Sequence, residues 1–165
     1  MAIDVLRAIA SGNLKKLDEL INSGSDVHEV TEVENWNYLH KAFLSPRRLP
    51  PSDIICYLID LGLNVNAVDC YGNTPLHYAV RQKNPSCIKA LLEKGAEKSL
   101  HQTNIDGVSP LRQAFIGQPY DYESIKTLLE YGADLDVKNG GGSVRERVNI
   151  LAGVDDSIME LIEKY

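Results

Sequence analysis

Two short stripes of apolar residues open the chain. Val5 and Ile9 mark the first stripe, and Leu17 and Ile21 mark the second. Apolar residues at this spacing fall on one face of a helix, so this part of the chain is predicted to form two short helices. Gly24 follows the second stripe, and glycine is a residue at which helices often end.

The helix-ending glycine recurs along the chain. It stands at positions 24, 62, 95 and 132, at intervals of 38, 33 and 37 residues, and each time it follows an apolar helical stripe. A self-similar period of roughly 20 to 50 residues is typical of repeat proteins. Because one helix pair cannot bury its apolar face alone, neighbouring pairs are expected to stack, giving an all-α solenoid.

The clearest unit reads DCYGNTPLHYA at residues 69–79. Gly72 can take a positive φ in a turn, Thr74 can cap a helix, and Pro75 fits the first turn of that helix. The run LLEKGA at residues 91–96 then closes a second helix. This spacing resembles the ankyrin repeat, a unit of about 33 residues built from a β-turn and two helices. The resemblance implies an ankyrin-repeat solenoid of about five helix-turn-helix units joined by β-turn loops.

Two further copies depart from the motif, and each carries an insertion. Residues 38–43 have tyrosine in place of the motif proline, and residues 106–114 have arginine in place of the motif histidine. From the motif leucine to the closing glycine these copies span 23 and 21 residues, against 19 in the clearest unit. Insertions of four and two residues therefore fall in the loops at 45–51 and 117–122.

The two ends of the chain resemble degenerate cap repeats. Residues 1–30 hold the opening helix pair without the turn, and residues 137–165 begin with an eroded glycine turn at 139–143. Arg145 stands where the other copies carry their core leucine, which indicates that no further repeat packs there. We expect a single domain over residues 1–165, with the full repeats at 31–66, 67–99 and 100–136.

Charge and cysteine usage narrow the classes of function. The 17 basic and 23 acidic residues give a net charge of −6, which opposes nucleic-acid binding and suits a partner with a basic surface. Three cysteines without a C-x-x-C pair argue against a disulfide framework or a zinc site, so we expect a cytoplasmic protein. No apolar run approaches the roughly 18 residues of a membrane helix, and the N-terminus does not resemble a signal peptide. We expect no membrane association and a monomer when the protein is free.

Motifs for catalysis are absent from the sequence. It contains no G-x-S-x-G, no phosphate-binding glycine loop and no H-E-x-x-H. His40 and His77 occupy the motif histidine position, where the resemblance implies that the imidazole bonds to backbone and joins neighbouring repeats. His28 and His101 have no partner at the spacing of metal ligands. We therefore expect no enzyme activity, no cofactor and no metal.

The resemblance implies that partners bind along the turn tips and along the exposed face of each first helix. Aromatic residues and arginine, which are common at binding hot spots, occur at several of these positions. Carried over by position, with one tyrosine added from the second inserted loop, the candidate protein-binding residues are Glu32, Glu34, Trp36, Lys41, Tyr71, Asn73, Tyr78, Arg81, Gln82, Ile105, Asp106, Val108, Gln113 and Tyr120.

Two features allow more than one interpretation. Trp36, which follows the acids of residues 26–34, either faces a partner from a turn tip or folds back over Phe43 or the N-terminal cap. Each inserted loop is either tolerated surface length or a binding feature, and Tyr120 belongs to the second loop.

The leading hypothesis is a non-enzymatic interaction module that binds one protein partner through its concave face and turn tips. A more specific form is an inhibitor of a basic protein, such as an immunity protein against a toxin. The alternatives are a scaffold, adaptor or host-directed effector and, in another class, a small-molecule-binding enzyme accessory with a pocket at the insertions. A neighbouring toxin gene would favour the inhibitor, whereas a ligand-induced rise in melting temperature would favour the accessory.

Overall fold

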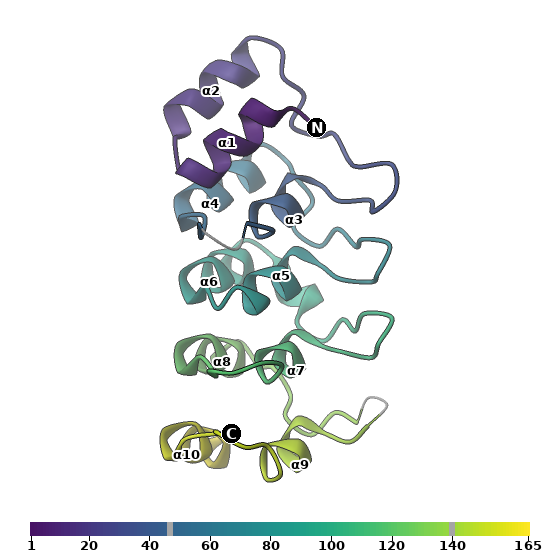
Figure 1. The fold of residues 1–165 in the computed structure, drawn as a ribbon, viewed down its shortest axis with the longest axis vertical. Coiled ribbons are helices and arrows are strands. Elements are labelled where there is room, and N and C mark those ends of the chain that lie inside the picture. The colour runs from purple at the N-terminus through teal and green to yellow at the C-terminus, as the bar shows by residue number, and fades with distance from the viewer. Residues whose placement is uncertain (46–47, 139–140) are drawn as a thin grey trace.

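The computed structural model describes residues 1–45, 48–138 and 141–165. Within these residues the chain forms ten α-helices and one short 3₁₀ helix, and no strand is assigned. The helices lie in pairs that follow one another in a stack from the N-terminus to the C-terminus (Figure 1). The predicted all-α solenoid of five helix pairs is confirmed.

The first helix of each pair is begun by a capping residue wherever the turn motif is present. The side chains of Asn37, Ser109 and Ser143 each accept a hydrogen bond from a backbone N–H of the first turn, and Thr74 takes the same place in the clearest repeat. The five first helices are α1 (Ile3–Ser11), α3 (Tyr38–Ala42), α5 (Pro75–Arg81), α7 (Pro110–Ala114) and α9 (Val144–Val148).

The second helix of each pair is nine residues long and packs against its neighbours in the stack. The central leucines, such as Leu58, Leu91 and Leu128, are fully buried, and one continuous apolar core runs through all five pairs. The second helices are α2 (Leu14–Asn22), α4 (Ser52–Asp60), α6 (Pro85–Glu93), α8 (Tyr122–Glu130) and α10 (Asp156–Lys164), with the 3₁₀ helix η1 (Ala96–Ser99) after α6.

Between one pair and the next, the chain extends away from the helices as a loop that we call a finger (Figure 1). Finger 1 comprises residues 24–37, finger 2 residues 62–74 and finger 3 residues 95–109. Each finger is closed near its tip by a backbone hydrogen bond of 3.0 Å: Thr31 N to Trp36 O, Asp69 N to Asn73 O, and Asn104 N to Val108 O. The predicted turns are therefore narrow hairpin-like loops.

Neighbouring fingers are bonded to one another through their backbones. Cys70 N donates to Glu34 O at 2.9 Å, and Ile105 N donates to Tyr71 O at 3.0 Å. This close approach explains the glycine of the motif. Gly72 has φ of 78°, and a Cβ built on it would lie 2.9 Å from the Cα of Asn104 in the next finger.

The motif histidines join each repeat to the next finger, as predicted. His40 Nε2 lies 3.3 Å from the carbonyl oxygen of Asn73, and His77 Nε2 lies 3.0 Å from that of Val108. Both imidazoles are fully buried. Burial lowers the pKa of both side chains, that of His77 to about 4, so each imidazole is neutral at neutral pH and holds a fixed backbone contact.

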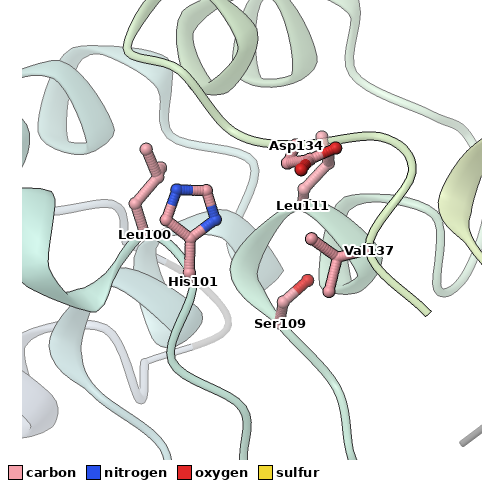
Figure 2. Close-up of a pocket in the computed structure, with 6 residues that line it drawn as sticks. All are labelled: Leu100, His101, Ser109, Leu111, Asp134 and Val137. Carbon is pink, nitrogen blue, oxygen red and sulfur yellow. The ribbon is translucent and has the colours of Figure 1, made fainter. Parts of the chain in front are cut away.

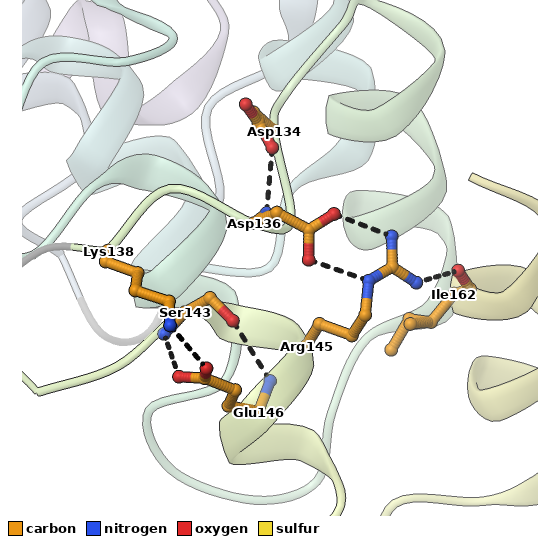
Figure 3. Close-up of polar contacts among 7 residues, drawn as sticks. All are labelled: Asp134, Asp136, Lys138, Ser143, Arg145, Glu146 and Ile162. Carbon is orange, nitrogen blue, oxygen red and sulfur yellow. Dashed lines mark hydrogen bonds and ion pairs between the residues drawn. The ribbon is translucent and has the colours of Figure 1, made fainter.

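Arg145, in the position of the core leucine, is accommodated by polar contacts within the last repeat (Figure 3). Its guanidinium donates to both carboxylate oxygens of Asp136, at 2.8 and 3.1 Å, and to the carbonyl oxygen of Ile162 at 3.0 Å. Lys138 pairs with Glu146 at 2.9 Å beside these contacts. Of the predicted glycine turn at 139–143, positions 139 and 140 lie outside the described residues, as do positions 46 and 47 of the first inserted loop.

Candidate protein-binding surface

The tips of fingers 1 to 3 form one exposed edge, which we call the finger edge. Val33 is 78% exposed, Tyr71 47% and Ile105 71%. Because the backbone bonds described above link adjacent tips, the tips that carry these three apolar side chains lie in one row. An exposed apolar row with polar neighbours is the usual composition of a protein contact.

Finger 1 adds negative charge to this edge. It carries Asp26, Glu29, Glu32 and Glu34 and has no lysine or arginine. Glu29 is occupied within the fold, because it lies 3.1 Å from the N-terminal ammonium group and accepts a hydrogen bond from Tyr38. Glu32 is exposed and Glu34 is half-buried at the tip, so these two predicted residues remain accessible.

Trp36 takes neither of the two positions that the sequence suggested. Its indole N–H donates to the Asp69 carboxylate at 2.9 Å and to the Tyr78 hydroxyl at 3.1 Å. The ring meets that of Tyr78 edge-on, and the Lys41 ammonium lies 4.8 Å from the indole centroid. Trp36 thus packs forward onto the next repeat, and one face of it is covered by Lys41.

Asp69 is the acceptor at the centre of this contact. Its carboxylate receives the Tyr78 hydroxyl at 2.6 Å and the backbone N–H groups of Tyr71 and Asn73 at 2.9 and 2.8 Å, besides Trp36. Burial opposes ionisation of this group, but the hydrogen bonds outweigh burial and lower the pKa of Asp69. Burial and the adjacent carboxylate raise the pKa of Tyr78 to about 12.

Three predicted binding residues are buried, so their assignment to an exposed surface was wrong. Tyr78 is 3% exposed, Asn73 4% and Gln113 7%. Asn73 accepts a hydrogen bond from Asn104 of the next finger, and Tyr78 lies between Trp36 and the His40 ring. Sequence position alone places Asn73 at a turn and Tyr78 on a helix face, but Asn104 of finger 3 and Trp36 of finger 1 contact them in the stack.

The other predicted residues of the first helices are at least partly accessible. Arg81 is exposed and lies 4.9 Å above the Tyr78 ring, whereas Lys41 and Gln82 are half-buried. In finger 3, Asp106 is exposed and Val108 is half-buried, with its carbonyl occupied by His77.

The loops that join first to second helices form what we call the loop edge, and here side chains bridge adjacent repeats. Asn84 donates to Pro50 O at 3.0 Å, Lys83 donates to Pro119 O, and Gln118 donates to Ala152 O. The described parts of both inserted loops therefore make contacts between adjacent repeats.

Tyr120, which was predicted to bind a partner, belongs to these contacts. Its ring packs on Phe115, with the centroids 5.7 Å apart, and its hydroxyl donates to Ala152 O at 3.3 Å. The side chain is half-buried and contacts the last repeat, and its assignment to the binding surface stays a prediction.

Sequence reasoning missed the charge of the first helices, because it considered only the net charge of the whole chain. Arg81, for example, was assigned to the binding surface by its position in the repeat, without regard to its positive charge. These helices carry two acidic residues, Asp4 and Glu146, and six basic ones, Arg7, Lys41, Arg81, Arg112, Arg145 and Arg147. Counting charges by helix position would have found this.

A serine, a histidine and an aspartate line one small hollow between repeats (Figure 2). Ser109 Oγ accepts a hydrogen bond from Arg112 N as a helix cap, and His101 and Asp134 are both exposed. The volume is about 10 Å³, room for one water molecule at most, so no substrate fits there. Among the described residues, no group of three or more His, Cys, Asp or Glu is placed to hold a metal ion.

Comparison with known proteins agrees with this geometry. The family model for ankyrin repeats (3 copies) matches residues 5–102 and 52–139. The chain belongs to the ankyrin repeat family. This family generally serves in non-enzymatic protein–protein interaction, so the ankyrin array described here is an interaction module.

Several curated proteins are similar in sequence. Human B-cell lymphoma 3 protein is 30% identical over 141 residues, 81% of this chain and 30% of that protein. A putative ankyrin repeat protein of Rickettsia bellii is 29% identical over 143 residues, 82% of this chain and 59% of that protein. Human NF-kappa-B inhibitor zeta is 28% identical over 142 residues, 68% of this chain and 19% of that protein. The chain therefore spans between 19% and 59% of the length of these relatives. None of the helices in its described part is long and apolar enough to cross a membrane.

Proposed function

We propose that the finger edge binds a protein partner through a segment that carries both apolar and basic residues. The observation that supports this is that the bonded tips of fingers 1 to 3 expose Val33, Tyr71 and Ile105, and that finger 1 adds the carboxylates of Glu32 and Glu34. Apolar side chains supply most of the binding energy of such a contact, and the carboxylates select a basic surface. One chain carries the whole edge, so a monomer suffices.

A finer form of this proposal is inhibition. An array that covers a basic site on its partner blocks whatever anionic substrate that site binds, and one similar protein is itself named as an NF-kappa-B inhibitor. An immunity protein that neutralises a toxin is one case of this form. A cytoplasmic location is in keeping with the three free cysteines.

The test begins with a partner purified from the native cell, whose affinity is then measured with defined variants. Glu32→Lys combined with Glu34→Lys should weaken binding by about tenfold or more at low salt, with an unchanged melting temperature, because both residues lie in a loop. Glu160→Lys combined with Glu163→Lys is the matched control, since these exposed acids lie on α10 and the change in net charge is the same. Equal affinity of the wild type and the finger variant at low salt would overturn the proposal.

The inhibition form has its own test. Adding the purified array should reduce the activity of the partner on an anionic substrate, and the finger variant should restore that activity. A partner that stays fully active in the saturated complex would leave binding in place and would exclude inhibition.

A further inference from the structure

An apolar groove lies between α1 and α3, on helices that the finger edge does not use. Its volume is about 280 Å³, and its apolar lining includes Ile3, Leu6, Ala10 and Ala42. Ile3 is 64% exposed, a large apolar side chain left in contact with water. A groove of this volume has room for side chains of a protein segment.

One helix position beside the groove carries different side chains in successive repeats. Arg7, Lys41 and Tyr78 occupy the same position in α1, α3 and α5, two residues after a buried apolar residue. Tyr78 turns inward and meets the His40 ring at 5.7 Å, which fills the boundary between α3 and α5. Lys41 instead lies over the indole of Trp36, so α3 presents no aromatic ring at this position; the buried Tyr38 packs elsewhere along the α1–α3 boundary, where its hydroxyl accepts a hydrogen bond from Ala2 N at 2.9 Å.

The rim of the groove is basic. Arg7 and Lys41 both line it, and α3 carries no acidic residue. The nearby acid is Asp4, which pairs with Arg7 at 3.1 Å. Both members of this pair are more than half exposed, so exchanging Asp4 for a carboxylate of a partner costs little.

From the apolar floor and the cationic rim together, we infer that this groove binds a segment of a protein partner whose large apolar side chain is flanked by aspartate or glutamate. The apolar side chain displaces water from the floor, and the flanking carboxylates reach Arg7 and Lys41. The charge preference is opposite to that of the finger edge. The array therefore has two contact surfaces of opposite sign, and the groove selects acidic sequences that the carboxylates of finger 1 repel.

Selection from a displayed library of short random peptides on the intact protein tests this inference without a known partner. Peptides bound by the wild type are screened again on Arg7→Glu combined with Lys41→Glu. Sequences lost on this variant should carry a large apolar residue with neighbouring Asp or Glu, and their affinity should fall by about tenfold or more. Lys15→Glu combined with Lys16→Glu on α2 is the control, and it should retain these peptides.

Ala10→Trp provides a second variant, which fills the floor and leaves the rim charges in place. It should abolish binding of the same peptides, while the finger variant Glu32→Lys with Glu34→Lys should retain them. The inference is overturned if the library yields no peptide sensitive to Arg7 and Lys41, or if the sensitive peptides are basic or lack an apolar residue. Should Ala10→Trp fail to fold, the charge-reversed pair decides alone. Because the finger variant is scored separately, the two surfaces succeed or fail independently.

Discussion

The finger edge and the loop edge are both built from irregular chain, but they connect adjacent repeats in different ways. At the finger tips backbone groups make the joining bond, as in Cys70 N to Glu34 O, so a tip side chain such as Tyr71 stays exposed. Elsewhere in the fingers, side chains such as Trp36 and Asn104 also join repeats. On the loop edge side chains make the bonds, as Gln118 and Tyr120 of the second inserted loop do to Ala152. Added loop length is therefore not by itself evidence of a binding surface.

The largest expected effect lies in the core that both edges share. Leu91→Ala removes a fully buried side chain from α6 and should lower the free energy of unfolding by about 2–5 kcal/mol. Urea unfolding at neutral pH measures this change. Because the core supports both edges, amide exchange should rise in fingers and loops alike; a rise confined to one edge would show that the edges are stabilised separately.

A smaller effect is expected from the histidine that bonds to finger 3, because protonation of His77 should lower the free energy of unfolding. The pKa of His77 falls to about 4 in the folded chain, from an ordinary value near 6.5. Between these pH values the unfolded chain binds more protons than the folded one, so stability falls as pH falls through this window, by about 3 kcal/mol for this side chain. The pKa of Asp69 is also lowered, from a value that is already acidic. The stability that is lost when Asp69 is protonated is therefore lost mostly at lower pH than this window.

Urea unfolding from pH 7 to pH 4 measures this dependence. His77→Gln is the control, and it should make the curve shallower within the window because glutamine does not titrate there, while His40, whose pKa burial also lowers, keeps part of the slope. An equally steep curve in His77→Gln would show that other groups cause the loss of stability.

The smallest effect is expected on the loop edge. Gln118→Ala removes one hydrogen bond from an exposed side chain, so unfolding should become easier by less than about 1 kcal/mol. Binding of a finger-edge partner should not change. Thermal melting and affinity measured on the same sample check both points. A marked loss of affinity would show that the inserted loop belongs to the binding surface.

How far the sequence predicts the candidate surface depends on which neighbours a residue has. Ile105 and Asp106 were assigned to the surface because turn tips extend away from the helices, and both are exposed. Tyr78 was assigned there from helix position alone and is buried, because its cover comes from Trp36, 42 residues earlier in the chain. No local pattern contains that contact.

The fold of this protein follows from local patterns in its sequence. Gly72, Thr74, Pro75 and His77 act through local turn, cap and backbone bonds, so their spacing specifies each repeat and the family. Which side chains stay accessible to a partner depends on tertiary contacts. Contacts between repeats cover Tyr78 and Asn73 and place Tyr120 against the last repeat. The reason is physical: exposure and local charge depend on residues a full repeat away, whereas helices and turns depend on residues a few positions apart.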